Sequence, residues 1–447
     1  MSSLPPNIKF ESFINQSFLH NLYQNMLAAL VVSFVAISLG ASFGVMSGRG
    51  ALSGMLAAGI IACITSLLGG TRIQCSGPTA PMSAVSVAVF FAATQLSADK
   101  LAGMTIDQVF NFTVILSSLI LLIAAILRTG NLIRFIPHTV ISGFMSGIAM
   151  LIWIAQIKQL FLLDGTWTFG KTQALNTGVA ILTLAIIFGL PRIKQRHIYR
   201  VVWAIMPFFP MTLFAIIFCT LLVHWLGLPI ATIDIDATLF SGSIVEWVGS
   251  QIPSEFSWNL FWFSLPLAFE LSLLCYLDTL MTALVMDKMS REKTKRNREL
   301  AAQGVANAIA VMFGGLPGAQ ATIRSVLILK EGATSRLAGV LVGIFVIIEL
   351  FVFLDWISLI PQAVFVGILF KVGYDVFDWT IVKAVYKKLT KQPTAFSFFD
   401  LPLIVLTVLV TIFYNLSAAA IGATVLFYLI QKFSNNVLPD LYGIVED

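Results

Sequence analysis

The chain of 447 residues is 58% hydrophobic and only 11% charged, and its mean hydropathy is +0.92. Soluble domains carry about a quarter charged residues, so this chain could not cover a soluble surface. The net charge of +5 gives no indication of a nucleic-acid partner. Most of the chain falls into apolar runs of about 17–25 residues, the helix length that spans a bilayer. The composition therefore predicts an all-α polytopic membrane protein whose partner is the lipid bilayer.

Two further classes are excluded by what the chain does not contain. It begins Met1-Ser2-Ser3-Leu4, without a basic n-region or a small-residue cleavage pattern, so we predict no signal peptide. The histidines are scattered, and no nucleophile–base or metal-ligand constellation appears, so the sequence does not indicate an enzyme. The cysteines lie within or beside apolar segments without metal-ligand spacing, which favours packing roles. These cysteines are Cys63, Cys75, Cys219 and Cys275.

Fourteen apolar segments can be placed in chain order, seven in each half. The first seven lie near 23–45, 50–69, 79–95, 107–127, 135–161, 173–190 and 201–226. The second seven lie near 258–286, 300–313, 319–332, 336–355, 358–375, 398–414 and 417–434. An odd number of spans per half makes the second half start from the opposite side of the membrane. This is how inverted-topology repeats arise.

The charges in the connecting loops support this count. Lys and Arg gather in the loops 191–200 and 287–299 and in the stretch 371–391, and basic loops mark the cytoplasmic side. The long loop 227–257 holds acidic residues and no Lys or Arg. With fourteen spans, all three basic stretches fall in the cytoplasm and the acidic loop falls outside. Both termini are then expected in the cytoplasm of an inner or plasma membrane protein.

Two of the segments, the third and the tenth, are broken by Gly and Pro. The first break reads Gly77-Pro78-Thr79-Ala80-Pro81, and the second reads Gly314-Gly315-Leu316-Pro317-Gly318. Pro cannot donate a backbone hydrogen bond and Gly does not favour helix, so we expect an extended stretch followed by a half-helix. Non-helical backbone at membrane depth is tolerated only where it is buried in protein or lines a cavity. The matched breaks therefore predict a binding site.

The polarity of the half-helices indicates what this site binds. Two helix N-termini present free N–H groups and positive dipole ends to a shared point, which suits an anion. Arg324, in the first turn of the second half-helix, adds a full positive charge there. The alternative is that Gly and Pro are simply common in membrane helices and that Arg324 snorkels to an interface.

A carboxylate in the eighth segment indicates a second ligand. Asp278 and Thr282 are four residues apart and so share one helix face. An intramembrane carboxylate is costly and needs a cation, a proton or a basic partner, and an oxygen cage for Na⁺ would satisfy it. The alternative is an ion pair between Asp278 and Arg324 without a cation. Glu270, on a similar face, is either a proton or access-path residue or an interfacial carboxylate. Phe43, among small residues of the first span, either faces a cavity or packs.

These residues resemble the sulfate permease family of anion transporters, and within it the cyanobacterial Na⁺-dependent bicarbonate transporters. The resemblance lies in Gly77–Met82, Leu277–Asp287, Glu299–Asn307 and Phe313–Ala319, followed by Thr322 and Arg324. It implies a seven-plus-seven inverted repeat with a core that moves against a gate in an elevator-like cycle, usually as a homodimer. Family members usually continue into a cytoplasmic STAS domain; this chain stops at Asp447, about where that domain would begin, so the domain is either lacking or lies outside this sequence.

The resemblance also implies a division into domains. The core domain is expected to consist of 23–128 together with 258–355, and the gate domain of 129–226 together with 356–434. The remaining pieces are a cytoplasmic N-terminus at 1–22, the extracellular loop 227–257 and a cytoplasmic C-terminal stub at 435–447.

Site residues follow from the same resemblance. The residues expected to bind the anion are Phe43, Thr79, Ala80, Ala321, Ile323 and Arg324. The residues expected around Na⁺ are Thr79, Asp278, Thr282, Gly318 and Thr322. No covalent cofactor is expected, only Na⁺ as the coupling ion.

The leading hypothesis from the sequence is secondary active uptake of a small inorganic anion, bicarbonate, coupled to Na⁺. A sulfate or other dianion transporter coupled to H⁺ is the alternative within the class, with Glu270 or Asp278 as the proton carrier. An uncoupled anion channel is the alternative from another class. Nucleobase transport would need base-reading polar side chains that the sequence does not show.

Overall fold

The structure is a computed structural model that describes residues 8–96, 104–135, 137–163, 166–194, 211–232, 244–252, 257–390, 400–413 and 416–433. In the first half of the chain the helices are α1 (Ile8–Met46), α2 (Ala51–Leu68), α3 (Ala80–Thr94), α5 (Ile106–Ile126), α6 (His138–Phe161), α7 (Lys171–Lys194) and α9 (Met211–Trp225), with a 3₁₀ turn η1 (Thr129–Phe135) before α6.

In the second half the helices are α10 (Ile244–Ser250), α11 (Trp258–Ser290), α12 (Arg296–Met312), α13 (Thr322–Lys330), α14 (Arg336–Ser358), α15 (Gln362–Val376), α16 (Trp379–Leu389), α17 (Asp400–Phe413) and α18 (Leu416–Phe433). The strands are very short: β1 (Ser76–Gly77) pairs with β4 (Ala319–Gln320), and β2 (Leu162–Leu163) pairs with β3 (Thr166–Trp167). The predicted all-α class is therefore confirmed.

Seven helices of the described residues are long and apolar enough to cross a membrane. They are those spanning His20–Met46, Ala51–Leu68, Ile106–Ile126, Thr139–Phe161, Lys171–Gly189, Trp258–Asp287 and Arg336–Phe353. Three further apolar helices are shorter, at Ala80–Thr94, Phe214–Trp225 and Asp400–Phe413. A stretch of the seventh predicted segment, 201–210, lies outside the described residues. The count of fourteen spans remains a prediction.

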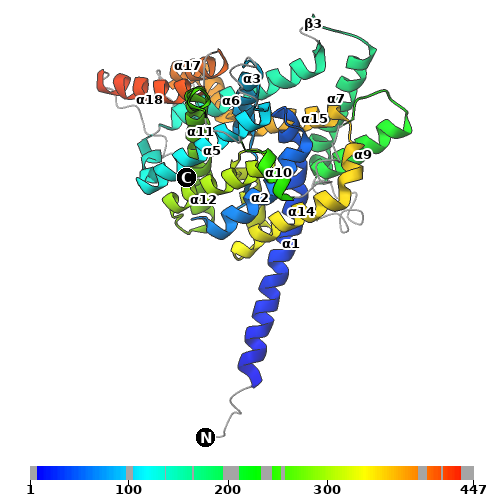
Figure 1. The fold of residues 1–447 in the computed structure, drawn as a ribbon, viewed down its shortest axis with the longest axis vertical. Coiled ribbons are helices and arrows are strands. Elements are labelled where there is room, and N and C mark those ends of the chain that lie inside the picture. The colour runs from blue at the N-terminus through cyan, green and yellow to red at the C-terminus, as the bar shows by residue number, and fades with distance from the viewer. Residues whose placement is uncertain are drawn as a thin grey trace.

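Three helical stretches lie where the sequence predicted a loop or a terminus. Helix α1 begins at Ile8 instead of near 23, and its first turns project from the helical body (Figure 1). Helix α10 lies within the acidic loop, and α16 lies within the basic stretch 371–391. A search for apolar runs misses α16 because lysines interrupt its apolar residues. Asp378 begins this helix by accepting a hydrogen bond from the backbone N–H of Thr380 at 3.0 Å.

Helices at matching positions in the two halves of the chain pack on partners that also match, and several of these partners come from the other half. Helix α2 packs on α14 and α1, and the corresponding helix α12 packs on α5 and α11. Half-helix α3 packs on α11, and half-helix α13 packs on α1. Elsewhere in the molecule, α6 packs on α17 while α7 packs on α15. An inverted repeat with interlocked halves has this exchange of partners.

Candidate substrate and ion site

The two broken segments meet in the interior of the molecule. Strands β1 and β4 are antiparallel, with Ser76 opposite Gln320 and Gly77 opposite Ala319. A side chain at Gly318 would place its Cβ 2.3 Å from the carbonyl carbon and oxygen of Gly77. Gly77 itself has φ of +151°, a conformation that L side chains rarely adopt. The glycines are therefore required because the two backbones cross in contact.

Both half-helices begin directly after this crossing. The N-cap of α3 is Thr79 and that of α13 is Ala321, and both N-caps have extended backbone. Neither N-cap side chain accepts a hydrogen bond from its helix, so the first-turn N–H groups are not capped by it. Pro81 in the first turn of α3 has no N–H to leave unsatisfied. The expectation of an extended stretch followed by a half-helix is met at both breaks.

Arg324 joins the two segments at the crossing. Its side chain is buried, with 1% of the residue exposed, and its Nη2 donates to the carbonyl oxygen of Pro78 at 2.8 Å. Its Nη1 lies beside Gly77 and has no hydrogen-bond partner among the described residues. An arginine buried in this way does not snorkel to an interface. The site therefore holds a buried positive charge with one donor group available.

Asp278 lies close to the start of both half-helices. The hydroxyl of Thr79 donates to its Oδ2 at 2.7 Å, and one helical turn later the hydroxyls of Thr282 and Thr322 are 2.5 Å apart. The ion pairs found among the described side chains do not include Asp278 with Arg324; they are Arg49–Asp107, Arg72–Glu292 and Lys371–Asp375. The alternative of a simple Asp278–Arg324 ion pair is therefore not what this structure shows.

A pocket opens on this face of α11. Its polar lining comes from Asp278, Thr282 and Thr322, beside Pro81 of α3. The rest of the lining is apolar and comes from α6 and α11: Val140, Ile141, Phe144, Met145, Leu274, Leu277, Met281 and Val285. The polar groups of the pocket therefore lie on α11 and at the start of α13, whereas its lining from α6 and α3 is apolar.

The other predicted site residues, including Thr79 and Arg324, are not among those that line this pocket. Ala80 and Ala321 are buried at the starts of the half-helices, whereas Ile323 is 46% exposed. Phe43 is buried in the main apolar cluster and does not line the pocket. The carbonyl oxygen of Gly318 already accepts hydrogen bonds from the Asn307 amide at 3.0 Å and from the Cys275 thiol at 3.3 Å. Its assignment as a Na⁺ ligand remains a prediction, and its observed role is the close contact with Gly77.

Sequence reasoning did not single out Asn307 or Glu299, both on α12. Asn307 holds both backbone groups of Gly318, donating to its oxygen and accepting from its N–H at 2.9 Å. Glu299 accepts from the N–H groups of Gly70 and Thr71 at 2.7 and 2.8 Å, where the chain leads into the first break. The signal was available, because a polar residue recurs every four positions along the buried face of α12.

Residues 22–399 match the Sulfate permease family. The bicarbonate transporter BicA of Picosynechococcus sp. is 28% identical over 435 residues, covering 94% of this chain and 72% of that protein. The putative sulfate transporter YvdB of Bacillus subtilis is 28% identical over 371 residues, covering 80% of this chain and 66% of that protein. The solved transmembrane domain of a cyanobacterial bicarbonate transporter BicA has a TM-score of 0.72 at 28% identity, covering 90% of this chain and 98% of that one.

Long apolar helices around two half-helices that start at an internal crossing define an integral membrane transporter. The family match covers most of the chain and includes both broken segments. The chain belongs to the sulfate permease family. This membership points to a transporter and not to an enzyme.

Proposed function

We propose that this protein takes up a small inorganic anion, bicarbonate, together with Na⁺. The observation that carries the proposal is the pocket that Asp278 and Thr282 of α11 line together with Thr322, the first residue of half-helix α13. The similarity to BicA, a bicarbonate transporter, supports bicarbonate as the substrate. Bicarbonate and Na⁺ have opposite charges, so their joint occupancy cancels most of the charge that the pocket must accommodate.

Na⁺ would bind on the carboxylate side of the pocket. The Asp278 carboxylate, in an apolar helix, is not in any of the ion pairs found among the described residues. Hydroxyl oxygens of Thr79 and Thr322 lie beside this carboxylate and beside Thr282, and such oxygens are the ligands that hard cations prefer. We assign Asp278, Thr282 and Thr322 to Na⁺, with Thr79 supporting the carboxylate.

The anion would bind between the two half-helix N-termini. Uncapped N–H groups at the starts of α3 and α13 favour a negative charge there. Arg324 contributes its full positive charge to the same place from a buried position. The Na⁺ site and the anion site would then be adjacent, so that each ligand strengthens the binding of the other.

The transport step would move residues 23–128 and 258–355, the proposed core, against residues 129–226 and 356–434, the proposed gate. Helix α6 of the gate presents an apolar surface to the pocket, which gives it no polar contact with the cargo. A core loaded with both ions crosses more easily than a core loaded with one, so the Na⁺ gradient drives uptake. We place the termini in the cytoplasm and expect a homodimer in the membrane.

Uptake of labelled bicarbonate into proteoliposomes, with and without an inward Na⁺ gradient, tests the proposal. We expect uptake to depend on Na⁺, and Asp278→Asn to lose this dependence while the protein remains folded. Bicarbonate uptake that is unchanged without Na⁺ would disprove the coupling.

The similarity to a putative sulfate transporter makes sulfate the competing substrate. If unlabelled sulfate competes with bicarbonate, and uptake rises steeply at low external pH, the protein is instead an H⁺-coupled dianion transporter. Macroscopic anion currents in a planar bilayer, without Na⁺ dependence, would instead identify a channel.

A further inference from the structure

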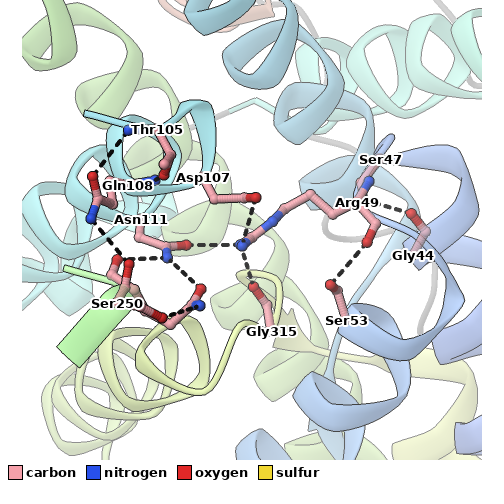
Figure 2. A network of polar contacts seen from close by, with 11 residues as sticks. Gly44, Ser47, Arg49, Ser53, Thr105, Asp107, Gln108, Asn111, Ser250 and Gly315 are labelled. Atoms are coloured by element: carbon pink, nitrogen blue, oxygen red, sulfur yellow. Dashed lines mark hydrogen bonds and ion pairs between the residues drawn. The ribbon is translucent and has the colours of Figure 1, made fainter. Parts of the chain in front are cut away.

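A second buried arginine lies outside the lining of the pocket. Arg49 is in the turn between α1 and α2, and only 4% of its side chain is exposed. Figure 2 shows its guanidinium between α5 and the second broken segment. None of the proposed ligand contacts uses this residue.

The guanidinium of Arg49 has three polar partners and one aromatic neighbour. Nη1 donates to the carbonyl oxygen of Gly315 at 2.9 Å and to Oδ1 of Asn111 at 2.8 Å. Nη2 is 2.9 Å from Oδ1 of Asp107, a side chain that is 55% exposed. The charge also lies 4.7 Å from the centre of the Phe110 ring. Hydrogen bonds from a charged guanidinium are strong, and their planar geometry fixes the positions of the groups that accept them.

The short helix α10 and the residue after it cover the same place. The Nδ2 group of Asn111 donates to the backbone oxygen of Gln251 at 2.8 Å and to its Oε1 at 3.1 Å. The Trp247 ring lies against Gly314, where an added Cβ would be 3.0 Å from Cζ2. The second broken segment is therefore held at its first residues by the turn that precedes α2, by α5 and by α10.

This segment is fixed at two points, three residues apart. Arg49 holds the Gly315 carbonyl, and Asn307 holds both backbone groups of Gly318. The next residues form β4 and then the first turn of α13, which carries Thr322 and Arg324. Because the segment between the two points is short and non-helical, a shift at Gly315 is transmitted to the crossing and to the pocket.

We propose that Arg49 is a positioning residue for the anion and Na⁺ site, acting through the Gly315 carbonyl without touching either ligand. Its effect on transport rests on the proposed function; its effect on the second broken segment does not. Replacing Arg49 leaves two buried acceptors, the Gly315 oxygen and Oδ1 of Asn111, without their donor. Gly315 then keeps its N–H bond to the carbonyl oxygen of Ala310, at 2.8 Å, but loses its side-chain support, so the start of α13 is held less firmly.

The transport experiment compares Arg49→Gln and Arg49→Lys with two controls. We expect Arg49→Gln to raise the KM for bicarbonate, and the Na⁺ concentration for half-maximal uptake, by on the order of tenfold. Arg49→Lys keeps the charge but can make fewer of the contacts, so both values should lie between those of the wild type and Arg49→Gln. Asp107→Asn keeps the Gly315 contact and should have wild-type KM. Arg298→Gln removes another arginine-to-carbonyl bond, an exposed one to Leu68, and should also have wild-type KM.

A merely structural role predicts a different result: a lower maximal rate in proportion to the folded protein, with unchanged KM. That result for Arg49→Gln would overturn the proposal. Hydrogen–deuterium exchange in lipid nanodiscs gives a second measurement that needs no substrate. Arg49→Gln should speed exchange in peptides covering 313–322, and Arg298→Gln should not. Unchanged exchange there also overturns the proposal, whereas a wild-type protein that takes up no bicarbonate overturns only the proposed function.

Discussion

Asn307 shows how much one side chain contributes to the crossing of the broken segments. Its amide is both donor and acceptor for Gly318, and it is buried, with 2% of the residue exposed. An amide carries its donor and its acceptor on separate atoms, so it can satisfy a backbone N–H and a backbone carbonyl of the same residue together. Buried backbone groups that lose such a partner carry a full desolvation cost.

Replacing Asn307 should therefore destabilise the protein, and two substitutions separate the loss of both hydrogen bonds from the loss of the donor alone. Asn307→Ala removes both hydrogen bonds, and we expect a loss of about 2–4 kcal/mol in the free energy of unfolding. Asn307→Asp keeps the acceptor for the Gly318 N–H but replaces the donor with an oxygen that faces the Gly318 carbonyl. It should lose Na⁺-dependent uptake without being more stable than Asn307→Ala. Thermal unfolding in detergent and uptake in proteoliposomes give the two readings, and a fully stable Asn307→Ala would contradict the assigned role.

The pair of threonine hydroxyls allows a more local test of the ion site. Val has nearly the shape of Thr without the hydroxyl, so Thr282→Val or Thr322→Val should raise the Na⁺ concentration for half-maximal uptake several-fold, by about 1 kcal/mol per lost ligand. Thr407→Val in α17 is a matched control, because the Thr407 hydroxyl only donates to Leu403 of its own helix. If all three variants respond equally to Na⁺, the threonines are not ligands.

Among these residues, Asp278 could be predicted from the sequence because a carboxylate in an apolar segment stands out. Thr282 followed from helical spacing. Thr322 was expected through a family resemblance, but its 2.5 Å contact with Thr282 depends on how α13 lies against α11, which helical spacing does not encode. Phe43 is buried in the apolar cluster, and its expected place at the anion site stays a prediction, because an aromatic residue among small residues packs as readily as it faces a cavity.

At the scale of elements, the crossing of β1 and β4 determines where both half-helices begin. Its two strands have only two residues each, and they pair residues from opposite halves of the chain. Few backbone hydrogen bonds stabilise such a pair, so the helices around it must hold it in place. The glycines allow contact between the backbones, and the prolines stop either segment from continuing as helix.

Gly318→Ala should therefore prevent the crossing. Its Cβ would lie 2.3 Å from backbone atoms of Gly77, which cannot move aside as a flexible side chain could. We expect loss of uptake and a clear fall in the temperature of unfolding. Gly178→Ala in α7 is the matched control, because an added Cβ there meets nothing within 4 Å. This control should be neutral or more stable by about 0.5–1 kcal/mol, and equal behaviour of the two variants would contradict the contact.

The breaks themselves were predictable, because Gly and Pro clustered inside an apolar run interrupt a helix wherever they occur. Their pairing was not predictable by local reasoning, since it joins Ser76 to Gln320 across more than half of the chain. Helices α10 and α16 were missed for a different reason. One is too short and the other too rich in lysine to appear as an apolar run, although both have helical hydrogen bonding.

For the whole molecule, the pocket lies where α11 faces α6. Helix α11 belongs to the proposed core and α6 to the proposed gate, so the pocket is at the boundary that would slide during transport. The apolar side chains of α6 can slide along this boundary without breaking hydrogen bonds. An elevator-like movement therefore requires α6 and α11 to move relative to each other, and this can be tested.

A disulfide between α6 and α11 should stop transport reversibly. Phe144→Cys with Met281→Cys places one thiol on each side of the pocket. After oxidation we expect uptake to fall by more than tenfold, and reduction to restore it. Asn25→Cys with Thr334→Cys is the control, because these residues share a hydrogen bond of 2.9 Å within the proposed core. If oxidation of the first pair leaves uptake unchanged, the two helices do not move relative to each other.

The connection between the two halves of the chain is attached at both of its ends. Near its start, the backbone and side-chain N–H groups of Gln362 donate to the carbonyl oxygens of Ala231 and Thr232, at 2.9 and 3.1 Å. Near its end, Gln251 accepts from Asn111. One attachment is to the proposed gate and the other to the proposed core. Eleven residues, 233–243, join Thr232 to the start of α10, and an extended chain of that length reaches at most about 40 Å. For the proposed sliding of the core against the gate, this linker would set an upper limit on the stroke.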